Sequence, residues 1–286
     1  MTERELSVTT EGAPVGARRA HVVRDGGSPE IDLVAVEEAL EIQIDGRSLA
    51  VTMRTPGHDR ELAAGFLYSE GVIDCIEDLE CVEEPRPAGS DLVTLNEGDD
   101  GALLGAARIS VRLSGELDAK RFESAHREIR ATAACGVCGK QSLDDLCQEL
   151  LVIEPLSCPL DFLRSLPDRM REQQELFEMT GGIHAAALFD PDGKLLCLRE
   201  DVGRHNAVDK VIGHALLAGE LPLQGRILAV SGRAGFELVQ KALKAAMPVM
   251  VSVGAASSVA VDMATDAGMT LYSFAGPGSG NWHVKT

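Results

Sequence analysis

From residue 183 to residue 274, short apolar segments alternate with amphipathic ones, and this regularity limits the fold more than any other sequence feature. The apolar segments are four to five residues long, which favours strands, and the segments between them have apolar residues at helical spacing. Such a series predicts βαβ crossovers and a largely parallel sheet with helices on both faces. The expected strands are Ala185–Phe189, its return strand Leu195–Arg199 after a turn at residues 190–193, Ile227–Val230, Val249–Val253 and Thr270–Phe274; the expected helices are Asn206–Leu217, Glu237–Ala246 and Ser257–Ala267.

The chain before residue 183 has a less regular pattern. Apolar and polar residues alternate over Leu40–Ile44 and Leu49–Met53 around Gly46, which predicts a β-hairpin. Further strands are expected over Leu92–Leu95 and Ala107–Leu113. Helices are expected over Arg60–Glu70, over residues 123–132 and 142–150, and over residues 160–178, where Pro167 would kink or divide the helix.

These patterns predict an α/β protein, α+β overall, in three parts. Residues 1–30 are rich in Gly, Pro, Ser and Thr and indicate a flexible tail. Residues 31–125 are expected to form a small N-terminal α+β domain, and residues 126–286 the larger α/β domain.

The composition restricts the possible partners. Lys and Arg number 27 against 45 Asp and Glu, which gives a formal net charge of −18. Nucleic acids and anionic membranes bind cationic surfaces, so neither is expected as a partner. Seven cysteines spread over 286 residues do not suggest a disulfide framework, and no apolar signal segment or membrane span is visible. We therefore expect a cytoplasmic protein with reduced thiols.

The pair Cys135 and Cys138 is the sharpest chemical signal. Gly136 and Gly139 give the backbone freedom to expose the thiols, and the following helix, together with Lys140, would lower a thiol pKa. Half of a zinc site, a dithiol redox motif and a sulfur- or acyl-carrying nucleophile are all compatible with this spacing. The other cysteines are scattered, and His184 is followed by Ala185-Ala186, without the glutamate of the zinc-deaminase His-x-Glu motif, which disfavours metal.

Three polar loops follow expected strands. Residues Arg199–Lys210 form the densest polar cluster of the chain, Ser231-Gly232-Arg233 follows one strand, and residues 254–258 follow the next. In open α/β sheets, ligands bind beyond the carboxyl ends of strands, near helix N-termini. The loops could therefore line one anion-binding crevice, although solvated turns have a similar composition. Thr180-Gly181-Gly182-Ile183-His184 is either a further ligand loop or an ordinary glycine turn beside a core histidine.

Together these segments resemble the FdhD family of formate dehydrogenase accessory sulfurtransferases. The resemblance covers about Val36 to Phe274. It rests on five segments in the family's order: Thr55-Pro56-Gly57-His58-Asp59 through Ile73, Cys135-Gly136-Val137-Cys138-Gly139, Thr180–His184, Glu200–Lys210 and Ser231-Gly232-Arg233. It implies a three-layer C-terminal domain similar to cytidine deaminases, without the zinc chemistry.

The resemblance also implies a function and its partners. Proteins of this family are homodimeric, cytoplasmic sulfur carriers. They take sulfane sulfur from a cysteine desulfurase and transfer it to the molybdenum bis(molybdopterin guanine dinucleotide) cofactor before this enters formate dehydrogenase. The cofactor is then a bound substrate, and no permanently bound metal is expected. A non-enzymatic cofactor chaperone and a dithiol oxidoreductase remain the alternatives.

By the same resemblance, Cys135 would carry the persulfide and Cys138 would assist or resolve it. Two departures from the family occur: Ala234-Gly235 replaces hydroxyl residues after Ser-Gly-Arg, and the C-terminal cofactor segment lacks its usual arginine, so its glycine amides would have to supply donors. The expected cofactor-binding residues are Gly182, His184, Arg204, His205, Asn206, Ser231, Arg233, Phe274, Ala275, Gly276, Pro277, Gly278 and Ser279.

Overall fold

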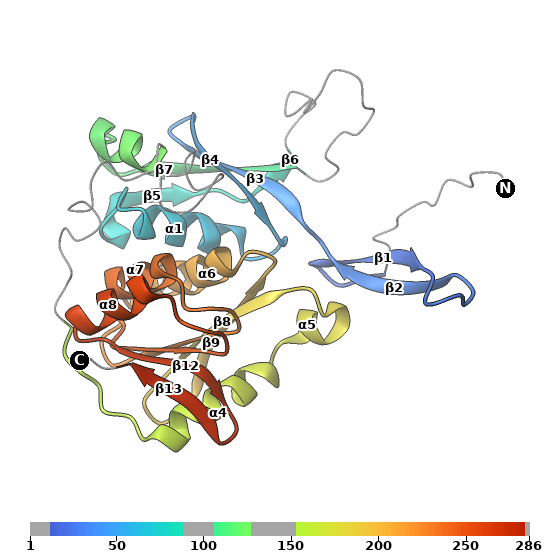
Figure 1. The fold of residues 1–286 in the computed structure, drawn as a ribbon. Coiled ribbons are helices and arrows are strands. Elements are labelled where there is room, and N and C mark those ends of the chain that lie inside the picture. The colour runs from blue at the N-terminus through green and yellow to red at the C-terminus, as the bar shows by residue number, and fades with distance from the viewer. Residues whose placement is uncertain (1–11, 88–105, 127–152, 284–286) are drawn as a thin grey trace.

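The computed structural model describes residues 12–87, 106–126 and 153–283. Their main element is a six-stranded sheet in the order β13-β12-β11-β10-β8-β9 (Figure 1). Each expected strand from residue 183 onward is present. The strands are β8 (His184–Phe189), β9 (Leu195–Asp201), β10 (Ile227–Val230), β11 (Val249–Ser252), β12 (Thr270–Gly276) and β13 (Ser279–His283).

The sheet is mixed, which corrects the prediction of a largely parallel sheet. Only the β10–β11 and β11–β12 pairs are parallel. The tight turn between β8 and β9 forces those two strands to be antiparallel, and β10 and β13 also pair antiparallel with their neighbours β8 and β12. As a result, the carboxyl ends of β9, β10, β11 and β12 all lie at one edge, beside the start of β8.

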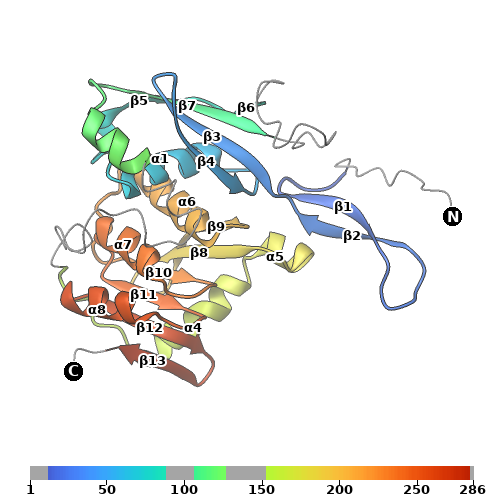
Figure 2. The same ribbon diagram turned by 45° about the horizontal axis from the view of Figure 1, so that its top comes forward.

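Helices cover both faces of this sheet, as predicted (Figures 1 and 2). Alternate residues of β8 show the two faces: Ala186 and Leu188 belong to the core on one side, and Ala185 and Ala187 to the core on the other. Helices α6 (Arg204–Leu217), α7 (Phe236–Lys244) and α8 (Ser258–Asp266) cover the first face, and α4 (Leu160–Arg171) covers the second. The C-terminal part is therefore a three-layer α/β/α arrangement.

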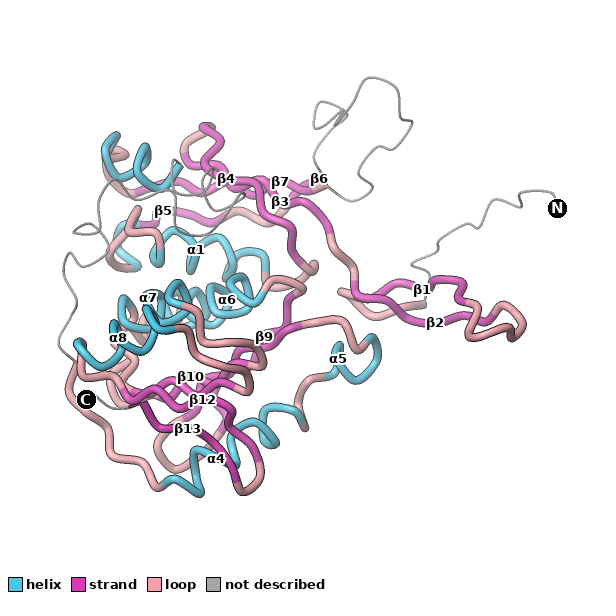
Figure 3. Tube along the Cα trace, in the orientation of Figure 1, coloured by secondary structure: helices cyan, strands magenta, loops and turns pink. Residues whose placement is uncertain are grey.

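A second, five-stranded sheet packs against the first through two helices (Figure 3). Its strands run in the order β4-β3-β7-β5, and the predicted hairpin and the strand at 107–113 are confirmed. Helix α1 (Asp59–Ser69) lies between this sheet and α6, and one hydrophobic core joins both sheets. The strands are β3 (Glu38–Ile44), β4 (Arg47–Arg54), β5 (Leu79–Val82) and β7 (Ala107–Leu113), with β6 (Arg86–Pro87) paired to β7 and the 3-10 helix η1 (Ile76–Asp78) before β5.

The N-terminal hairpin differs from the expected tail. Strand β1 (Ala17–Val22) pairs antiparallel with β2 (Glu30–Ala35), so part of the stretch predicted as flexible is a strand. The ribbon extends from the body of the protein (Figures 1 and 2). Its base is anchored because Val36 donates a backbone hydrogen bond to Gly16, and Ala17 is buried. Tertiary pairing, which the composition does not reveal, orders this segment.

Other predictions differ in detail. Pro167 lies inside α4 without ending it. The predicted helix is interrupted later, between the end of α4 and the start of α5 (Glu175–Thr180). Strand β13 was not predicted, because its Gly- and Asn-containing sequence lacks an alternating pattern. The strand expected at 92–95, the helix at 142–150 and the end of the helix at 123–132 lie outside the described residues. Among the helices that the structure describes, none is long and apolar enough to span a bilayer.

Candidate functional site

A continuous row of contacts crosses the sheet edge where four strands end. At its start, the Ser231 hydroxyl accepts a hydrogen bond from the Ala185 amide at 2.9 Å and lies 3.4 Å from His184 Nδ1. Next to it, Gly254 donates its backbone N–H to the Gly232 carbonyl at 2.9 Å, and Phe274 donates to the Gly254 carbonyl at 3.1 Å. The ends of β10, β11 and β12 and the start of β8 thus form one connected surface.

Gly254 allows the two central loops to pack this closely. A side chain there would begin 3.0 Å from the Gly232 carbonyl oxygen and 3.0 Å from the backbone of Arg233, closer than ordinary contact. Beyond this point the loops run in parallel through a bridge between Ala234 and Ala256. The prediction that the loops after β10 and β11 lie side by side is therefore confirmed.

Arg204 and Arg233 bring positive charge to this row. A methyl group placed on Gly232 would lie 3.7 Å from Arg204 Cδ and 3.6 Å from the His184 ring, so both side chains approach Gly232. Arg233 is exposed and Arg204 half-buried. Within residues 12–87, 106–126 and 153–283, neither guanidinium has an ion-pair or hydrogen-bond partner. Two unpaired arginines are notable in a chain with so many carboxylates.

Three helix N-termini point to the same edge. Helices α6, α7 and α8 begin at Arg204, Phe236 and Ser258, each directly after a loop of the row. Helix N-termini carry unpaired N–H groups and partial positive charge, which favour anions. In α8 the Ser257 side chain accepts one of these bonds, from the Ala260 amide. Backbone dipoles therefore add to the charge of the two arginines.

The histidines of the row differ in their surroundings. Burial lowers the pKa of His184, and the positive charges of Arg204 and His205 lower it further, so its imidazole is neutral at pH 7. His205 Nε2 lies 2.6 Å from the Glu237 carboxylate, and this hydrogen bond lowers the pKa of Glu237. His205 is thus paired with an acid, whereas His184 is not.

Asn206 does not contribute to the row. Its amide nitrogen donates to the Met53 carbonyl at 2.8 Å and to Asp201 at 3.0 Å, and its amide oxygen accepts from the Thr52 hydroxyl. Both of its donors are used inside the protein, so the predicted role as an anion donor is corrected to a structural one. The position of Asn206 in the first turn of α6 suggested that it contacts a ligand, but its side chain faces the second sheet.

The remaining predicted residues flank the row. Gly182 is exposed just before His184, whereas the Ala275 side chain is buried in the core beneath α4. Gly276 to Ser279 form the turn of the β12–β13 hairpin, beyond Phe274. Phe274 itself has a left-handed backbone (φ 51°) and a side chain that is 52% exposed. Its ring is thus an exposed aromatic surface at the end of this row.

Cys135, Cys138 and Lys140 lie outside the described residues. Of the four cysteines that are described, Cys158 and Cys197 are buried. Burial raises the pKa of both thiols, that of Cys197 to about 11, so they are poor nucleophiles at neutral pH. Within the same part of the chain, no cluster of three or more His, Cys, Asp or Glu could hold a metal ion.

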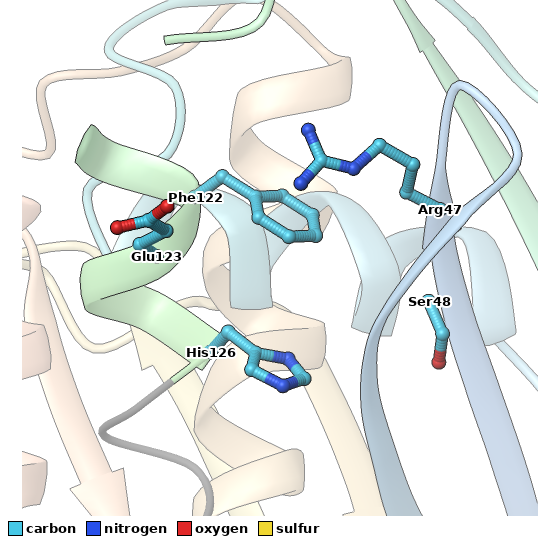
Figure 4. A pocket seen from close by; sticks show the side chains of 5 residues that line it. All are labelled: Arg47, Ser48, Phe122, Glu123 and His126. Atoms are coloured by element: carbon cyan, nitrogen blue, oxygen red, sulfur yellow. The ribbon is translucent and has the colours of Figure 1, made fainter. Parts of the chain in front are cut away.

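A hollow that was not predicted lies beside the helical segment at residues 119–126 (Figure 4). It is lined by Arg47, Ser48, Phe122, Glu123 and His126. The Arg47 guanidinium lies 4.2 Å from the centre of the Phe122 ring, and His126 Nδ1 is 2.9 Å from the Leu49 carbonyl. None of the predicted cofactor-binding residues that the structure describes lines it. The i, i+4 spacing of Phe122 and His126 was the only sequence signal for it.

Comparisons with known proteins agree with the sequence motifs. The chain matches the model of the FdhD/NarQ family over residues 35–283. It is 44% identical over 263 residues to the sulfur carrier protein FdhD of Streptomyces avermitilis, covering 90% of this chain and 89% of that protein. The same protein of Corynebacterium efficiens is 45% identical over 244 residues, covering 85% of this chain and 86% of the relative.

The fold also has a counterpart among solved structures. A crystal structure described as that of a formate dehydrogenase accessory protein from Desulfotalea psychrophila superimposes with a TM-score of 0.66 at 22% identity, covering 94% of this chain and 96% of that one. This likeness concerns the fold alone, whereas the family model and the close relatives extend over most of the sequence. The resemblance seen in the motifs is confirmed, and the chain belongs to the FdhD/NarQ family.

Proposed function

We propose that this protein is a sulfurtransferase that carries sulfane sulfur as a persulfide on Cys135. The relatives that share 44–45% of its residues are named sulfur carrier proteins. The glycine-flanked Cys-x-x-Cys segment is suited to such a role, because an accessible thiolate is needed to meet two large partners in turn. The buried Cys158 and Cys197 are unsuited to it.

The sulfur transfer can be written as two exchange steps. The Cys135 thiolate attacks the outer sulfur of a persulfide on a cysteine desulfurase; the donor S–S bond breaks, and the donor leaves as a thiolate. In the second step the Cys138 thiolate attacks Cys135 Sγ, a Cys135–Cys138 disulfide forms, and the terminal sulfur leaves as hydrosulfide for the acceptor. A cellular dithiol then reduces the disulfide.

The proposed acceptor is the molybdenum bis(molybdopterin guanine dinucleotide) cofactor, bound as a substrate at the sheet edge. The observation that carries this is the pair of unpaired arginines, Arg204 and Arg233, among three helix N-termini in a chain of net charge −18. Each guanine dinucleotide has a pyrophosphate, which such donors bind. The neutral His184 and the exposed Phe274 ring are further contacts for the nucleotide.

The proposal includes the family's cellular setting. A cysteine desulfurase would supply the sulfur and formate dehydrogenase would receive the loaded cofactor, with the protein acting as a cytoplasmic homodimer. The acidic surface outside the sheet edge supports binding of a small anion in a local site over binding of a polyanionic polymer.

Intact-mass measurement tests the carrier role. The protein is incubated with a cysteine desulfurase and cysteine, without reducing agent. We expect a mass increase of one sulfur atom, mapped to Cys135 and absent in Cys135→Ala. Cys197→Ala is the matched control, because this buried thiol should not take part. No adduct on the wild type, or an adduct that persists in Cys135→Ala, would contradict the proposal.

A non-enzymatic cofactor chaperone is the second candidate, favoured by the sheet-edge site, which contains no cysteine among the described residues. Formate dehydrogenase maturation in cells that contain only the Cys135→Ala protein separates the two. The carrier requires loss of maturation with nucleotide binding intact, whereas normal maturation would support the chaperone. A dithiol oxidoreductase would use the same two cysteines but would take up no added sulfur.

A further inference from the structure

A buried carboxylate, Asp201, organises the turn that leads into α6. It is fully buried: its Oδ2 forms an ion pair with Lys210 Nζ at 2.7 Å and accepts a hydrogen bond from the Thr55 amide at 3.2 Å, and its Oδ1 accepts from the Gly203 amide at 2.8 Å and Asn206 Nδ2 at 3.0 Å. Every acceptor site of this carboxylate faces a donor of the protein. Asp201 therefore cannot contact a ligand, and its effect must be exerted through the turn.

Thr55 holds the same turn from the other sheet. It lies after β4 and is also fully buried. Its hydroxyl accepts from the Val202 amide at 3.1 Å and donates to the Val36 carbonyl at 2.9 Å, while its carbonyl accepts from Lys210 Nζ at 2.9 Å. Thr55 thus bonds to two successive residues of the turn, Asp201 and Val202, although Val202 is 147 positions away in the sequence.

Lys210 completes the charge balance of this network. Its ammonium group forms an ion pair with Asp201 and donates hydrogen bonds to the Thr55 carbonyl and to the Glu200 carbonyl at 3.3 Å, so it contacts three oxygens. A buried charge pair with every polar group satisfied is rigid, because breaking any contact leaves a charge or a dipole without a partner. The network fixes the backbone from Asp201 to Gly203.

This turn determines where Arg204 lies. Arg204 follows Gly203 directly, as the first residue of α6, and its guanidinium has no partner in the described part of the chain. The backbone of the turn therefore sets where this side chain starts, beside Gly232, and the Glu237 carboxylate, whose pKa Arg204 lowers, is a nearby opposite charge. Gly203, the N-cap of α6, makes no side-chain cap, and its own backbone N–H is held by the Asp201 carboxylate.

We propose that Thr55 and Asp201 are positioning residues, which hold Arg204 in place for the phosphates of the guanine nucleotide. The inference rests on the proposed function of the sheet edge. A preorganised arginine binds an anion without first losing the freedom of its backbone, so a loosened turn weakens nucleotide binding through Arg204.

The test is a double-mutant cycle with guanosine diphosphate as the probe. Thr55→Val removes the hydroxyl and leaves the Val202 amide without its acceptor, and we expect about tenfold weaker binding by calorimetry. Thr55→Ser keeps the hydroxyl and should bind within about twofold of wild type. Thr265→Val is the matched control, because the Thr265 hydroxyl bonds only within its own helix.

The cycle is completed in an Arg204→Ala background. If Thr55 acts through Arg204, adding Thr55→Val there should change affinity by less than about twofold. An undiminished tenfold effect in that background, or no effect of Thr55→Val on the wild type, would overturn the inference. Should Thr55→Val not fold, Thr55→Ala removes the same hydroxyl without placing a methyl group against the Val202 amide.

The outcomes also separate this inference from the proposed function. If Arg204→Ala binds guanosine diphosphate as well as the wild type does, the nucleotide site is not at this edge and the proposed function fails with it. If Arg204→Ala binds weakly while Thr55→Val is unchanged, only the positioning role is lost.

Discussion

Gly213 of α6 packs directly against the backbone carbonyl of Glu61 in α1, and a side chain at Gly213 would overlap that oxygen. Gly65 of α1 faces the Asp209 carbonyl of α6 in the same way. The two helices that join the two sheets are thus in backbone contact. Close approach of this kind requires glycine, because any Cβ would separate the helices.

Gly213→Ala should therefore destabilise the protein, by about 3 kcal/mol, because the added methyl group forces the backbones apart. Chemical denaturation monitored by circular dichroism measures this. Gly115→Ala is the control, since no atom lies within 4 Å of the position of its Cβ. Equal stability of the two variants would show that α1 and α6 can separate without cost.

Lys241→Met should destabilise the protein by about 3–5 kcal/mol. Lys241 Nζ lies 2.8 Å and 3.0 Å from the two Asp209 oxygens and 3.1 Å from Glu70, in a buried cluster between three helices. Burial lowers the pKa of Lys241, but these carboxylates outweigh it and raise the pKa above its usual value. Without the lysine, Asp209 is buried without a counter-charge.

Lys244→Met on the same helix is the comparison for this variant. Its ammonium pairs with Asp74 at 3.3 Å near the surface, where an ion pair contributes about 1 kcal/mol at most. Adding Asp209→Asn to Lys241→Met should recover part of the loss, because the remaining group is neutral. A further loss of stability in the double variant would contradict this explanation.

Arg204→Ala and Arg233→Ala should each weaken guanosine diphosphate binding by about ten- to a hundredfold, the effect of losing a hydrogen bond to a charged group. Arg226→Ala changes the net charge equally, but Arg226 precedes β10 and lies at the opposite edge of the sheet. Its variant should bind as the wild type does. If all three variants bound guanosine diphosphate equally weakly, the effect would come from the net charge and not from a nucleotide site at this edge.

Nucleotide affinity should increase as the pH falls from 8 to 6, and more in the wild type than in His184→Asn. The pKa of His184 is lowered in the free protein, and a bound phosphate would raise it, so binding takes up a proton. The nucleotide's own titration is common to both proteins and cancels in the comparison. Identical pH profiles would exclude His184 from the site.

The free protein should become less stable as the pH falls. Because the folded-state pKa of His184 lies below that of the unfolded chain, near 6.5, the unfolded chain binds the proton more readily. The contribution of His184 is therefore lost as the pH falls through about 6.5. Unfolding measurements at pH 8 and pH 5.5 should show a smaller decrease in His184→Asn than in the wild type.

Much of the secondary structure could be predicted from the sequence alone. The strand at Ala107–Leu113 has the predicted bounds, and the hairpin around Gly46 is present. These elements have periodicities that reflect one buried face, and such patterns are local. Strands β1 and β13 could not be predicted, because they form by pairing with β2 and β12 and their own composition does not indicate a strand.

The site was only partly visible in the sequence. The motif order predicted the family, and strand-end placement predicted that Arg204, Ser231 and the loop at 254–258 meet. The prediction failed for Asn206, whose position in α6 is near the site but whose amide is used by Thr52 and Met53 of the other sheet. The direction in which a side chain points depends on contacts between distant segments, and a single sequence does not reveal these contacts.

Most elements, the family and the chemically active residue types could thus be predicted from local patterns and motifs. Strand direction, the pairing of charges and the burial of polar residues depend on contacts that exist only in the folded protein. Asp201 and Thr55 lie 146 positions apart, yet their hydrogen bond helps to hold Arg204 at the sheet edge. Such contacts form when two sheets close around α1 and α6, and burial then selects the pairs that leave no polar group unsatisfied.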